Sequence, residues 1–418
     1  MFKTVKGFHD IYGEDIEYWQ RAETALKELF KTYGFKEFRL PILEKTAVFN
    51  RGIGDTTDIV EKEMFTFVDA DGESVSLRPE GTASLMRAYI ENGLGNPPGV
   101  KKYFYMGNMF RRERPQKGRF RQFTQIGAEV LECDSPLLDA EVITLLSDTA
   151  KAVGIDDFVT MEINSIGCSS CRPVYREKLT EYFRQRVEGL CADCRRRLDK
   201  NPMRIIDCKN ENCRVISKDA PLVSEHLCDD CNSHFVKVKE YLERLNTPYR
   251  VNPTMVRGLD YYVRTAFELV TDRLGAASAV GGGGRYDGLV KLMGGGNVPG
   301  IGFAVGMDRI VALMKEKQRI AERKADVFVL FFEGKSEEPA LSLIKELRSS
   351  GLIVEYDYSI SSMKSQMKKA NRAGAKYAVI FGESEIESGN VSVKNLEDGG
   401  QSLEPIEGIA DTVRKLLV

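Results

Sequence analysis

The sequence lacks any run of apolar residues long enough to cross a membrane, and its start, Met1 to Gly7, contains no long apolar region. We therefore expect no signal peptide, no membrane span and a cytoplasmic location. The sequence also lacks a strong charge of either sign, because 60 Lys and Arg residues oppose 62 Asp and Glu residues for a net charge of −2. This balance excludes a general attraction for nucleic acid, so any such binding has to be local.

The composition that is present is typical of a soluble globular protein. Hydrophobic residues make up 42% of the chain and charged residues 29%. The 418 residues are too many for one ordinary core, so we expect two or three domains. Nine cysteines in a cytoplasmic chain favour metal ligands or free thiols over disulfides.

The stretch from Phe104 to Glu129 has the pattern of two strands joined by a long polar connection with proline and glycine. The planar guanidinium group suits phosphate oxygens, so a connection this rich in arginine predicts a site for a polyanion. A solvated basic loop is the alternative, but Glu113, Glu129 and Gln125 favour a pocket wall. The basic residues are Arg111, Arg112, Arg114, Lys117, Arg119 and Arg121.

Within this stretch, RRERPQKGRFRQF resembles motif 2 of the class II aminoacyl-tRNA synthetases, and specifically that of the histidyl-tRNA synthetase family. The resemblance implies that Arg111 contacts the ATP α-phosphate and that Arg119 reaches the γ-phosphate. It also implies that Glu113 meets the adenine amino group and that Phe123 stacks on the adenine ring. Gln116 is implied to contact the end of the tRNA acceptor stem.

The N-terminal part begins with apolar residues at helical spacing from Asp15 to Tyr33, which predicts an amphipathic helix. Phe38 to Leu43 is predicted as an edge strand, because Pro41 cannot donate to a central ladder. By the resemblance, this helix and strand form motif 1, a dimer-forming element that implies a homodimer, whereas a plain edge strand is the alternative. Met64 to Val68 and Ser74 to Leu77 are predicted to pair as a hairpin.

Glu80, Gly81 and Thr82 stand at the start of a predicted helix, where such residues are usually caps. The resemblance adds a second role, in which Glu80 and Thr82 hold the α-ammonium group of the amino acid with help from Gln125. Gly81 belongs to the same implied site.

The sequence RGLDYY, residues 257–262, places two tyrosines beside an arginine and an aspartate in a strand-like run. Standing alone, such tyrosines belong to a core by default. RGLDYY resembles the signature of the histidyl-tRNA synthetases, which implies that Tyr262, with Glu129 across the pocket, hydrogen-bonds the two imidazole nitrogens. Tyr261 belongs to the same implied site. Arg257 is implied to lie against the α-phosphate and the substrate carboxylate.

Residues 281–288 contain four consecutive glycines, which form either a flexible turn or a backbone that approaches a ligand closely. The resemblance makes this the second histidine-specific motif, with Tyr286 near the substrate. Pro299 to Arg309 is predicted as a glycine-rich strand that enters a helix. This stretch resembles motif 3 of the class II synthetases, in which Arg309 clamps the γ-phosphate. Asp308 departs slightly from the family, where glutamate is more frequent.

Residues from Cys168 to about His234 are rich in Arg, Lys, Glu and Cys and poor in strand signals, which predicts an inserted, mostly helical module. Eight thiolates in closely spaced pairs are enough for two tetrahedral zinc sites, which we predict as structural. His226 and His234 flank the last pair as alternative ligands. Unmetallated thiols are the alternative, and the family's function does not require zinc here. The pairs are Cys168 and Cys171, Cys191 and Cys194, Cys208 and Cys213, and Cys228 and Cys231.

From Ala325 the pattern alternates between strands and helices, which predicts a small α/β domain with a mixed sheet. Basic residues gather on its second helix, residues 362–373, and no acidic residue occurs from Ser361 to Lys376. A solvated helix face is the alternative to the role that the resemblance implies, which is contact with the tRNA backbone by an anticodon-binding domain. The basic residues are Lys364, Lys368, Lys369, Arg372 and Lys376.

Together these features predict an α+β protein with the antiparallel-sheet catalytic core of a class II synthetase, a helical insertion and a C-terminal α/β anticodon-binding domain. The predicted segments are residues 1–167 and 236–322 for the catalytic core, 168–235 for the cysteine-rich insertion and 325–418 for the anticodon-binding domain. The implied reaction is the ATP-dependent attachment of L-histidine to tRNA-His through histidyl-adenylate, with Mg²⁺ entering on ATP. Arg111, Arg257 and Arg309 are the implied catalytic residues, since they neutralise charge as the carboxylate attacks the α-phosphate.

Three other functions stay open at this point. A non-catalytic regulatory relative that binds histidine is disfavoured, because such proteins tend to lack the C-terminal domain and to degrade the arginine and RGLDYY motifs. A synthetase for a different amino acid is disfavoured by RGLDYY. A zinc-bound nucleic-acid-binding module without catalysis explains only the insertion.

Overall fold

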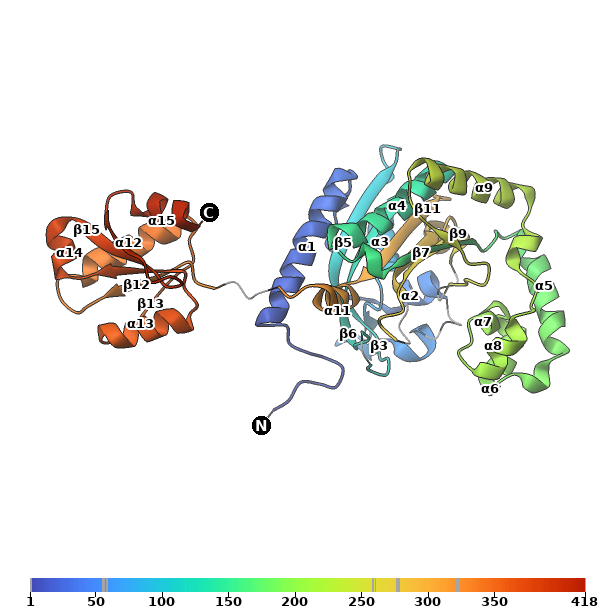
Figure 1. Ribbon diagram of the computed structural model, residues 1–418. Helices are drawn as coiled ribbons and strands as arrows, with labels where there is room; N and C mark the ends of the chain where they lie inside the picture. Colours follow the sequence, from blue (N-terminus) through green and yellow to red (C-terminus); the bar gives the residue numbers. More distant parts are fainter. Residues whose placement is uncertain are drawn as a thin grey trace. The chain divides into compact units, whose positions relative to one another are not determined.

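The computed structural model describes residues 2–54, 57, 59–116, 118–257, 259, 261–275, 279–320 and 324–417. Three residues of the predicted motifs, Lys117, Gly258 and Asp260, lie outside the described residues, as does the predicted boundary at residue 322. The chain divides into two compact units, Met1–Ile320 and Ala321–Val418. Figure 1 shows the elements of each unit.

The larger unit is built on an eight-stranded sheet in the order β1-β5-β6-β11-β10-β9-β7-β8. The six inner strands pair antiparallel, whereas the outer pairs β1–β5 and β7–β8 are parallel. The predicted antiparallel core is therefore confirmed. The strands are β1 (Lys36–Glu37), β5 (Lys101–Phe110), β6 (Gln122–Leu131), β7 (Thr160–Ser165), β8 (Arg250–Val251), β9 (Val263–Val270), β10 (Ala279–Arg285) and β11 (Gly300–Gly306).

Each face of this sheet carries its own apolar cluster, because neighbouring residues of a strand point to opposite faces. On β5, Phe104 packs with the helices α1 (Glu14–Thr32), α4 (Pro136–Ala152) and α11 (Met307–Lys317). The next residue, Tyr105, packs on the other face with α3 (Thr82–Glu91) and α10 (Leu289–Leu292). The predicted first helix is confirmed, and its apolar residues Trp19, Ala22, Leu26 and Phe30 are buried.

A smaller sheet in the order β2-β4-β3 precedes this core, with β2 (Leu43–Lys45), β3 (Phe65–Val68) and β4 (Ser74–Leu77), and α2 (Thr46–Ile53) follows β2. The predicted hairpin of β3 and β4 is confirmed. The predicted edge strand from Phe38 to Leu43 is wrong, since regular pairing stops at Glu37 and resumes at Leu43. The Arg78 guanidinium accounts for the gap, because it donates to the carbonyl groups of Leu40 at 2.7 Å and Pro41 at 3.2 Å in place of a strand partner.

The mostly helical insertion is confirmed between β7 and β8. Its first four helices enclose a core of their own around Tyr175, Leu179 and Phe183. The last helix starts inside the insertion but packs Phe235 and Val238 into the main core, and the predicted end at residue 235 falls within it. The helices are α5 (Cys171–Arg184), α6 (Ala192–Lys200), α7 (Met203–Ile206), α8 (Glu211–Ser217) and α9 (Asp229–Arg244).

The smaller unit has a mixed five-stranded sheet in the order β13-β12-β14-β15-β16. Its first three strands are parallel and the last two antiparallel, as the predicted mixed sheet requires. The sequence pattern missed α14 and β16, because the first is a short polar helix and the second is an exposed, polar edge strand that ends in proline. The elements are β12 (Val327–Phe331), α12 (Glu337–Ser349), β13 (Val354–Tyr356), α13 (Met363–Arg372), β14 (Tyr377–Phe381), α14 (Glu383–Ser388), β15 (Asn390–Asn395), β16 (Gln401–Pro405) and α15 (Ile409–Leu417).

Among the helices that the structure describes, none combines the length and the apolar character that a membrane span needs.

Candidate active site

A cavity of about 250 Å³ opens on the face of the large sheet that carries Tyr105. Its walls come from the start of α3, the β5–β6 connection, the described residues of the RGLDYY stretch, and the strands β10 and β11. Most of the predicted site residues meet there although they are far apart in the sequence. Those that line the cavity are Glu80, Thr82, Arg111, Glu113, Arg119, Phe123, Gln125, Arg257, Tyr261, Tyr262 and Arg309, whereas Gly81, Gln116, Glu129 and Tyr286 do not.

The connection between β5 and β6 forms one charged wall of the cavity. Arg111 donates from Nε to the carbonyl of Pro79 at 2.9 Å, and its guanidinium lies 5.2 Å from the centre of the Phe123 ring. Arg119 donates to the Glu113 carboxylate at 3.2 Å. One carboxylate thus faces two arginines beside an aromatic ring, which leaves this wall with excess positive charge and a flat apolar surface.

Arg309, in the first turn of α11, lines the cavity next to this connection. Its guanidinium donates to the carbonyl of Gly118 at 3.1 Å and to that of Ala279. Burial first, and then the charge of Arg119 with a smaller effect of Arg111, lowers the pKa of Arg309. Guanidinium groups that repel one another around a cavity are stabilised when a polyanion binds between them.

The start of α3 places a carboxylate in the wall next to these arginines. Glu80 accepts hydrogen bonds from the backbone N–H groups of Thr82 at 2.7 Å and Ala83 at 2.8 Å. Glu80 therefore does cap the helix, and it also lines the cavity. Burial raises the pKa of Glu80, and a bound cation would reverse that effect.

Glu129 is not among the residues that line the cavity, whereas its hydrogen-bond partner Thr82 is. It accepts hydrogen bonds from the hydroxyl groups of Tyr286 at 2.5 Å and Thr82 at 2.7 Å, and it is 1% exposed. Burial raises the pKa of Glu129 to about 8. The sequence motif therefore identifies a buried carboxyl group that is hydrogen-bonded to Thr82, and Thr82 lines the cavity.

The RGLDYY stretch precedes β9 and is not part of a strand among its described residues, so the strand-like prediction is wrong there. Arg257 pairs with Glu268 of β9, and its guanidinium lies 5.0 Å from the centre of the Tyr262 ring. Tyr261 packs 4.6 Å from Tyr262, ring centre to ring centre, and 5.9 Å from Tyr286. Burial raises the pKa of Tyr261, so its hydroxyl keeps the proton and can donate it in a hydrogen bond.

Several buried polar atoms in the described walls of the cavity have no hydrogen-bond partner within the protein. They are Gln125 Oε1, Tyr261 OH, Arg257 Nε and Arg119 Nε. Buried polar atoms in folded proteins are almost always paired, because an unpaired one costs about 1–3 kcal/mol. Two donors on guanidinium groups, one hydroxyl and one acceptor that converge on one cavity therefore indicate a polar ligand.

The run of four glycines is the central strand β10, so the flexible-turn interpretation is wrong. A Cβ atom on Gly282 would lie 2.7 Å from Arg257 Nη1, and one on Gly283 would lie 2.0 Å from the carbonyl oxygen of Gly302. Gly281 and Gly282 line the cavity directly. The glycines thus allow the neighbouring strand and the Arg257 side chain to approach the β10 backbone closely.

Tyr105 and Asp308 line the cavity but were not predicted as site residues. A Cβ atom on Gly81 would lie 2.2 Å from the Tyr105 ring, and one on Gly127 would lie 2.3 Å from it. Two glycines that make room for one buried tyrosine are a signal that appears only when the strands are paired. Asp308 accepts a hydrogen bond from the Thr124 backbone at 3.0 Å, which ties α11 to β6.

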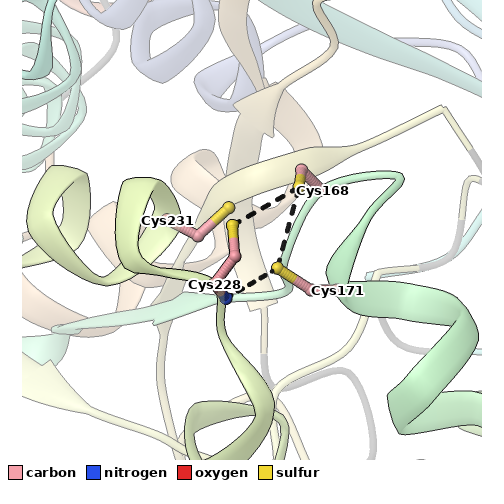
Figure 2. Close-up of side chains that lie close together, drawn as sticks. All are labelled: Cys168, Cys171, Cys228 and Cys231. Carbon is pink, nitrogen blue, oxygen red and sulfur yellow. Dashed lines mark hydrogen bonds between the residues drawn. The ribbon is translucent and has the colours of Figure 1, made fainter.

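The eight cysteines of the insertion form two groups of four, and in each group the thiol sulfur atoms lie within 4.8 Å of one another. Figure 2 shows the first group, in which Cys168 and Cys171 meet Cys228 and Cys231 at the start of α9. Neither group includes a histidine among the described residues. His234 instead bonds Asp139 at 2.8 Å, so its predicted role as an alternative ligand is wrong. The second group consists of Cys191, Cys194, Cys208 and Cys213.

The predicted basic helix of the smaller unit is α13. Lys364, Lys368 and Arg372 are exposed, and their spacing of four residues puts them on one face of the helix. Lys369 differs, because its ammonium group bonds Asp357 at 2.5 Å. Although burial opposes it, this bond helps to hold the pKa of Asp357 well below its usual range.

An antiparallel sheet with an arginine-lined cavity, joined to a second α/β unit, fits a class II aminoacyl-tRNA synthetase. A family model for histidyl-tRNA synthetase matches residues 7–310, and one for an anticodon binding domain matches residues 326–416. The chain belongs to the histidyl-tRNA synthetase family. The reaction of this family is the attachment of histidine to tRNA-His with ATP, through an adenylate intermediate.

Similar proteins match along nearly the whole chain. The histidine–tRNA ligase of Geobacter metallireducens is 49% identical and covers 96% of this chain and 97% of its own length. That of Syntrophotalea carbinolica is 47% identical, and the match covers 97% of this chain and 96% of the relative's own length. A crystal structure of apo histidyl-tRNA synthetase from S. aureus superposes with a TM-score of 0.84 at 34% identity, and covers 99% of this chain and 100% of its own.

Proposed function

We propose that the cavity on the large sheet is where this chain joins L-histidine to ATP and then passes the histidyl group to tRNA-His. The observation that carries the proposal is the set of buried, unpartnered polar atoms of Gln125, Tyr261, Arg257 and Arg119. These atoms match an amino acid joined to a phosphate, because they offer donors to oxygen atoms and an acceptor to an ammonium group.

The proposed ATP subsite is the charged wall. Arg111 contacts the α-phosphate, Arg119 and Arg309 hold the γ-phosphate, and Phe123 stacks on the adenine ring beside Glu113. The stacking is compatible with the 5.2 Å between the Arg111 guanidinium and the Phe123 ring, since a planar base can extend the same stack. ATP enters with Mg²⁺, and we assign no side chain to that ion.

The proposed histidine subsite lies on the other side of Arg257. Glu80 and Gln125 accept from the α-ammonium group, with Thr82 beside them and Gly81 keeping the helix start close to Tyr105. Tyr261 and Tyr262 face the imidazole, and Tyr286 and Glu129 support that wall from behind. A site built from paired polar groups rejects analogues that lack them, because its own groups are then left unpaired.

The proposed chemistry needs no nucleophile from the protein. The histidine carboxylate attacks the α-phosphate, pyrophosphate leaves, and the terminal ribose hydroxyl of the tRNA later attacks the acyl carbon. Arg257 lies between the two subsites, where it can bind the carboxylate and the α-phosphate together. With Arg111 and Arg309 it neutralises the charge that develops during adenylation.

The proposed tRNA contacts are Gln116 in the β5–β6 connection and the basic face of α13. Lys364, Lys368 and Arg372 are exposed for this role, whereas Lys369 would first have to leave Asp357. The resemblance of the N-terminal helix and the segment around Pro41 to motif 1 supports a homodimer, although that segment is not a regular strand, and a cytoplasmic location fits a synthetase. The four predicted segments, 1–167, 168–235, 236–322 and 325–418, remain part of the proposal, together with structural zinc on the eight cysteines.

The test is histidine-dependent exchange of pyrophosphate into ATP, with each other amino acid as a control. We expect exchange with histidine alone. Exchange with another amino acid would overturn the proposed histidine subsite and keep the fold. No exchange by folded protein that binds histidine would indicate a regulatory, non-catalytic role.

A further inference from the structure

We propose that the two cysteine groups are separate Zn²⁺ sites with different tasks, one folding the insertion and the other holding the histidine-binding segment in place. The outer group consists of Cys168, Cys171, Cys228 and Cys231, and the inner group of Cys191, Cys194, Cys208 and Cys213. The part of this inference that concerns histidine rests on the proposed role of Tyr262.

The distances between sulfur atoms fit a tetrahedral zinc site. Four thiolates at a Zn–S distance of about 2.3 Å stand about 3.8 Å apart along each edge of the tetrahedron. In the outer group Cys168 Sγ lies 3.6 Å from Cys171 Sγ and 3.8 Å from Cys228 Sγ. In the inner group Cys191 Sγ lies 3.9 Å from Cys208 Sγ. A disulfide needs about 2.05 Å, so these spacings match ligands of one ion and not a covalent pair.

The backbone around each group is arranged as it is around thiolate ligands. The Cys228 N–H donates to Cys171 Sγ at 3.1 Å, and the Ser170 N–H donates to Cys168 Sγ at 3.4 Å. In the inner group the Cys191 N–H donates to Cys213 Sγ at 3.2 Å. Amide donors stabilise negative sulfur, and four soft thiolates in a tetrahedron select zinc over the hard divalent cations.

The two groups are nested in the sequence, which gives the ions different tasks. The outer group joins the first cysteine pair of the insertion to the last pair, so it closes the insertion where the chain leaves and re-enters the catalytic core (Figure 2). The inner group joins only residues within the insertion. Cys194 and Cys213 of that group belong to the small apolar core around Tyr175 and Phe183.

The outer group is connected to the histidine-binding segment by a short series of hydrogen bonds. Arg172, the residue after Cys171, donates to the backbone carbonyl of Tyr262 and, at 3.4 Å, to that of Ile166. The Arg264 N–H donates to the carbonyl of Gly167, the residue directly before Cys168, at 2.9 Å. The backbone on each side of Val263 is therefore bonded to the turn that presents the first two cysteines. An ion that fixes this turn also fixes the position of Tyr262.

The zinc content of the full-length protein tests the two sites. We expect two zinc ions per chain by elemental analysis, one in each of Cys228→Ser and Cys191→Ser, and two in Cys133→Ser, whose thiol belongs to neither group. Replacement by Co²⁺ should give the absorption of tetrahedral cobalt thiolate for both sites. A protein prepared with zinc present that holds no metal, or that loses both ions with either single change, would overturn the assignment of two independent sites.

The Michaelis constants for histidine and ATP in pyrophosphate exchange test the coupling. Cys228→Ser should raise the KM for histidine roughly 10-fold, with little change in the KM for ATP, whereas Cys191→Ser should change neither. Arg172→Ala should raise the KM for histidine in the same way while keeping both zinc ions, and Arg172→Lys should restore part of the loss.

These outcomes separate the coupling from the proposals on which it rests. If Arg172→Ala and Cys228→Ser leave the KM for histidine unchanged, while wild-type exchange and two zinc ions are observed, the coupling alone is wrong. If the wild type shows no histidine-dependent exchange of pyrophosphate, the proposed function is wrong, and the coupling that rests on it is wrong too. Because the Arg172 variants keep all eight thiols, they remain informative even if Cys228→Ser does not fold.

Discussion

At the scale of single residues, Glu129 shows how burial changes the role that a motif implies. The sequence correctly identifies it as a polar residue on the strand beside the pocket. It cannot show that Thr82 and Tyr286 hold both oxygens of this carboxyl, because those partners come from other parts of the chain. Tyr105 was missed for the same reason, since the space for its ring is made by Gly81 and Gly127.

The raised pKa of Glu129 predicts a loss of stability with increasing pH. A carboxyl in an unfolded chain has a pKa of about 4.3, and burial raises that of Glu129 to about 8. Between these values the unfolded chain releases the proton that the native protein retains. A stabilising contribution present below about pH 4.3 is therefore lost as the pH rises, and the loss is complete above pH 8.

Glu129→Gln should remove this dependence, because the amide does not ionise. Relative to the wild type, the ligand-free variant should gain up to roughly 4 kcal/mol in free energy of unfolding between pH 5 and pH 9. Urea unfolding of both proteins at several pH values measures the difference, in which the other titrating groups cancel. If the free energies of unfolding of the two proteins change with pH in the same way, Glu129 is already ionised at neutral pH.

Arg257 carries the second prediction at this scale. Its Nε is buried without a protein partner, while Glu268 and the Tyr262 ring hold the rest of the guanidinium. Arg257→Ala should lower histidine-dependent pyrophosphate exchange by roughly 10²–10³-fold, because a preorganised donor to the reacting groups is lost. Histidine should still bind, as measured by calorimetry.

The matched control for Arg257→Ala is Arg244→Ala, which removes the same charge from an exposed position on α9. The control should keep the exchange rate of the wild type. Near-wild-type exchange by Arg257→Ala itself would remove Arg257 from the adenylation step.

At the scale of elements, local periodicity predicted helices well and strands less well. The spacing of Trp19, Ala22, Leu26 and Phe30 is sufficient because one helix face contacts one core. The glycines of β10 carry no such pattern, since what decides their structure is the close approach of β11 and Arg257. The segment after Glu37 fails as a strand because the partner of its carbonyl groups is a side chain, Arg78, that follows much later in the sequence.

The close packing around β10 predicts a loss of function without a change of any polar group. A Cβ atom on Gly282 would lie 2.7 Å from Arg257 Nη1 and 3.0 Å from the Phe267 carbonyl oxygen. Gly282→Ala should therefore displace Arg257 and lower the exchange rate at least roughly 10-fold while the protein still folds. Circular dichroism and pyrophosphate exchange measure the two effects.

Gly288→Ala is the control for this prediction, because a Cβ atom there would meet nothing within 4 Å. Its backbone is already in the right-handed helical region, so alanine is tolerated. We expect wild-type exchange from this variant. Equal activity of the two variants would show that the position of Arg257 does not depend on the absence of a side chain at Gly282.

At the scale of the whole molecule, the sequence predicted which segments exist but not how distant ones combine. The four cysteine pairs were evident, yet their assignment to an outer and an inner group depends on the path of the helices between them. The basic stretch on α13 was evident too. Only the structure separates its exposed face from Lys369, which Asp357 already neutralises.

The exposed face of α13 predicts a defect in the tRNA step that leaves adenylation intact. Replacing Lys364, Lys368 and Arg372 together by alanine should raise the KM for tRNA-His in aminoacylation and leave pyrophosphate exchange unchanged, because the amino acid and ATP do not need this unit's basic face. The dependence of tRNA affinity on salt should weaken, since each lost phosphate contact lowers the slope of log K against log salt by about 0.7–0.9. The control removes three exposed lysines from other parts of the same unit, Lys335, Lys345 and Lys415. If the control variant loses as much tRNA affinity and salt dependence as the α13 variant, the unit attracts tRNA by its overall charge and α13 is not the contact surface.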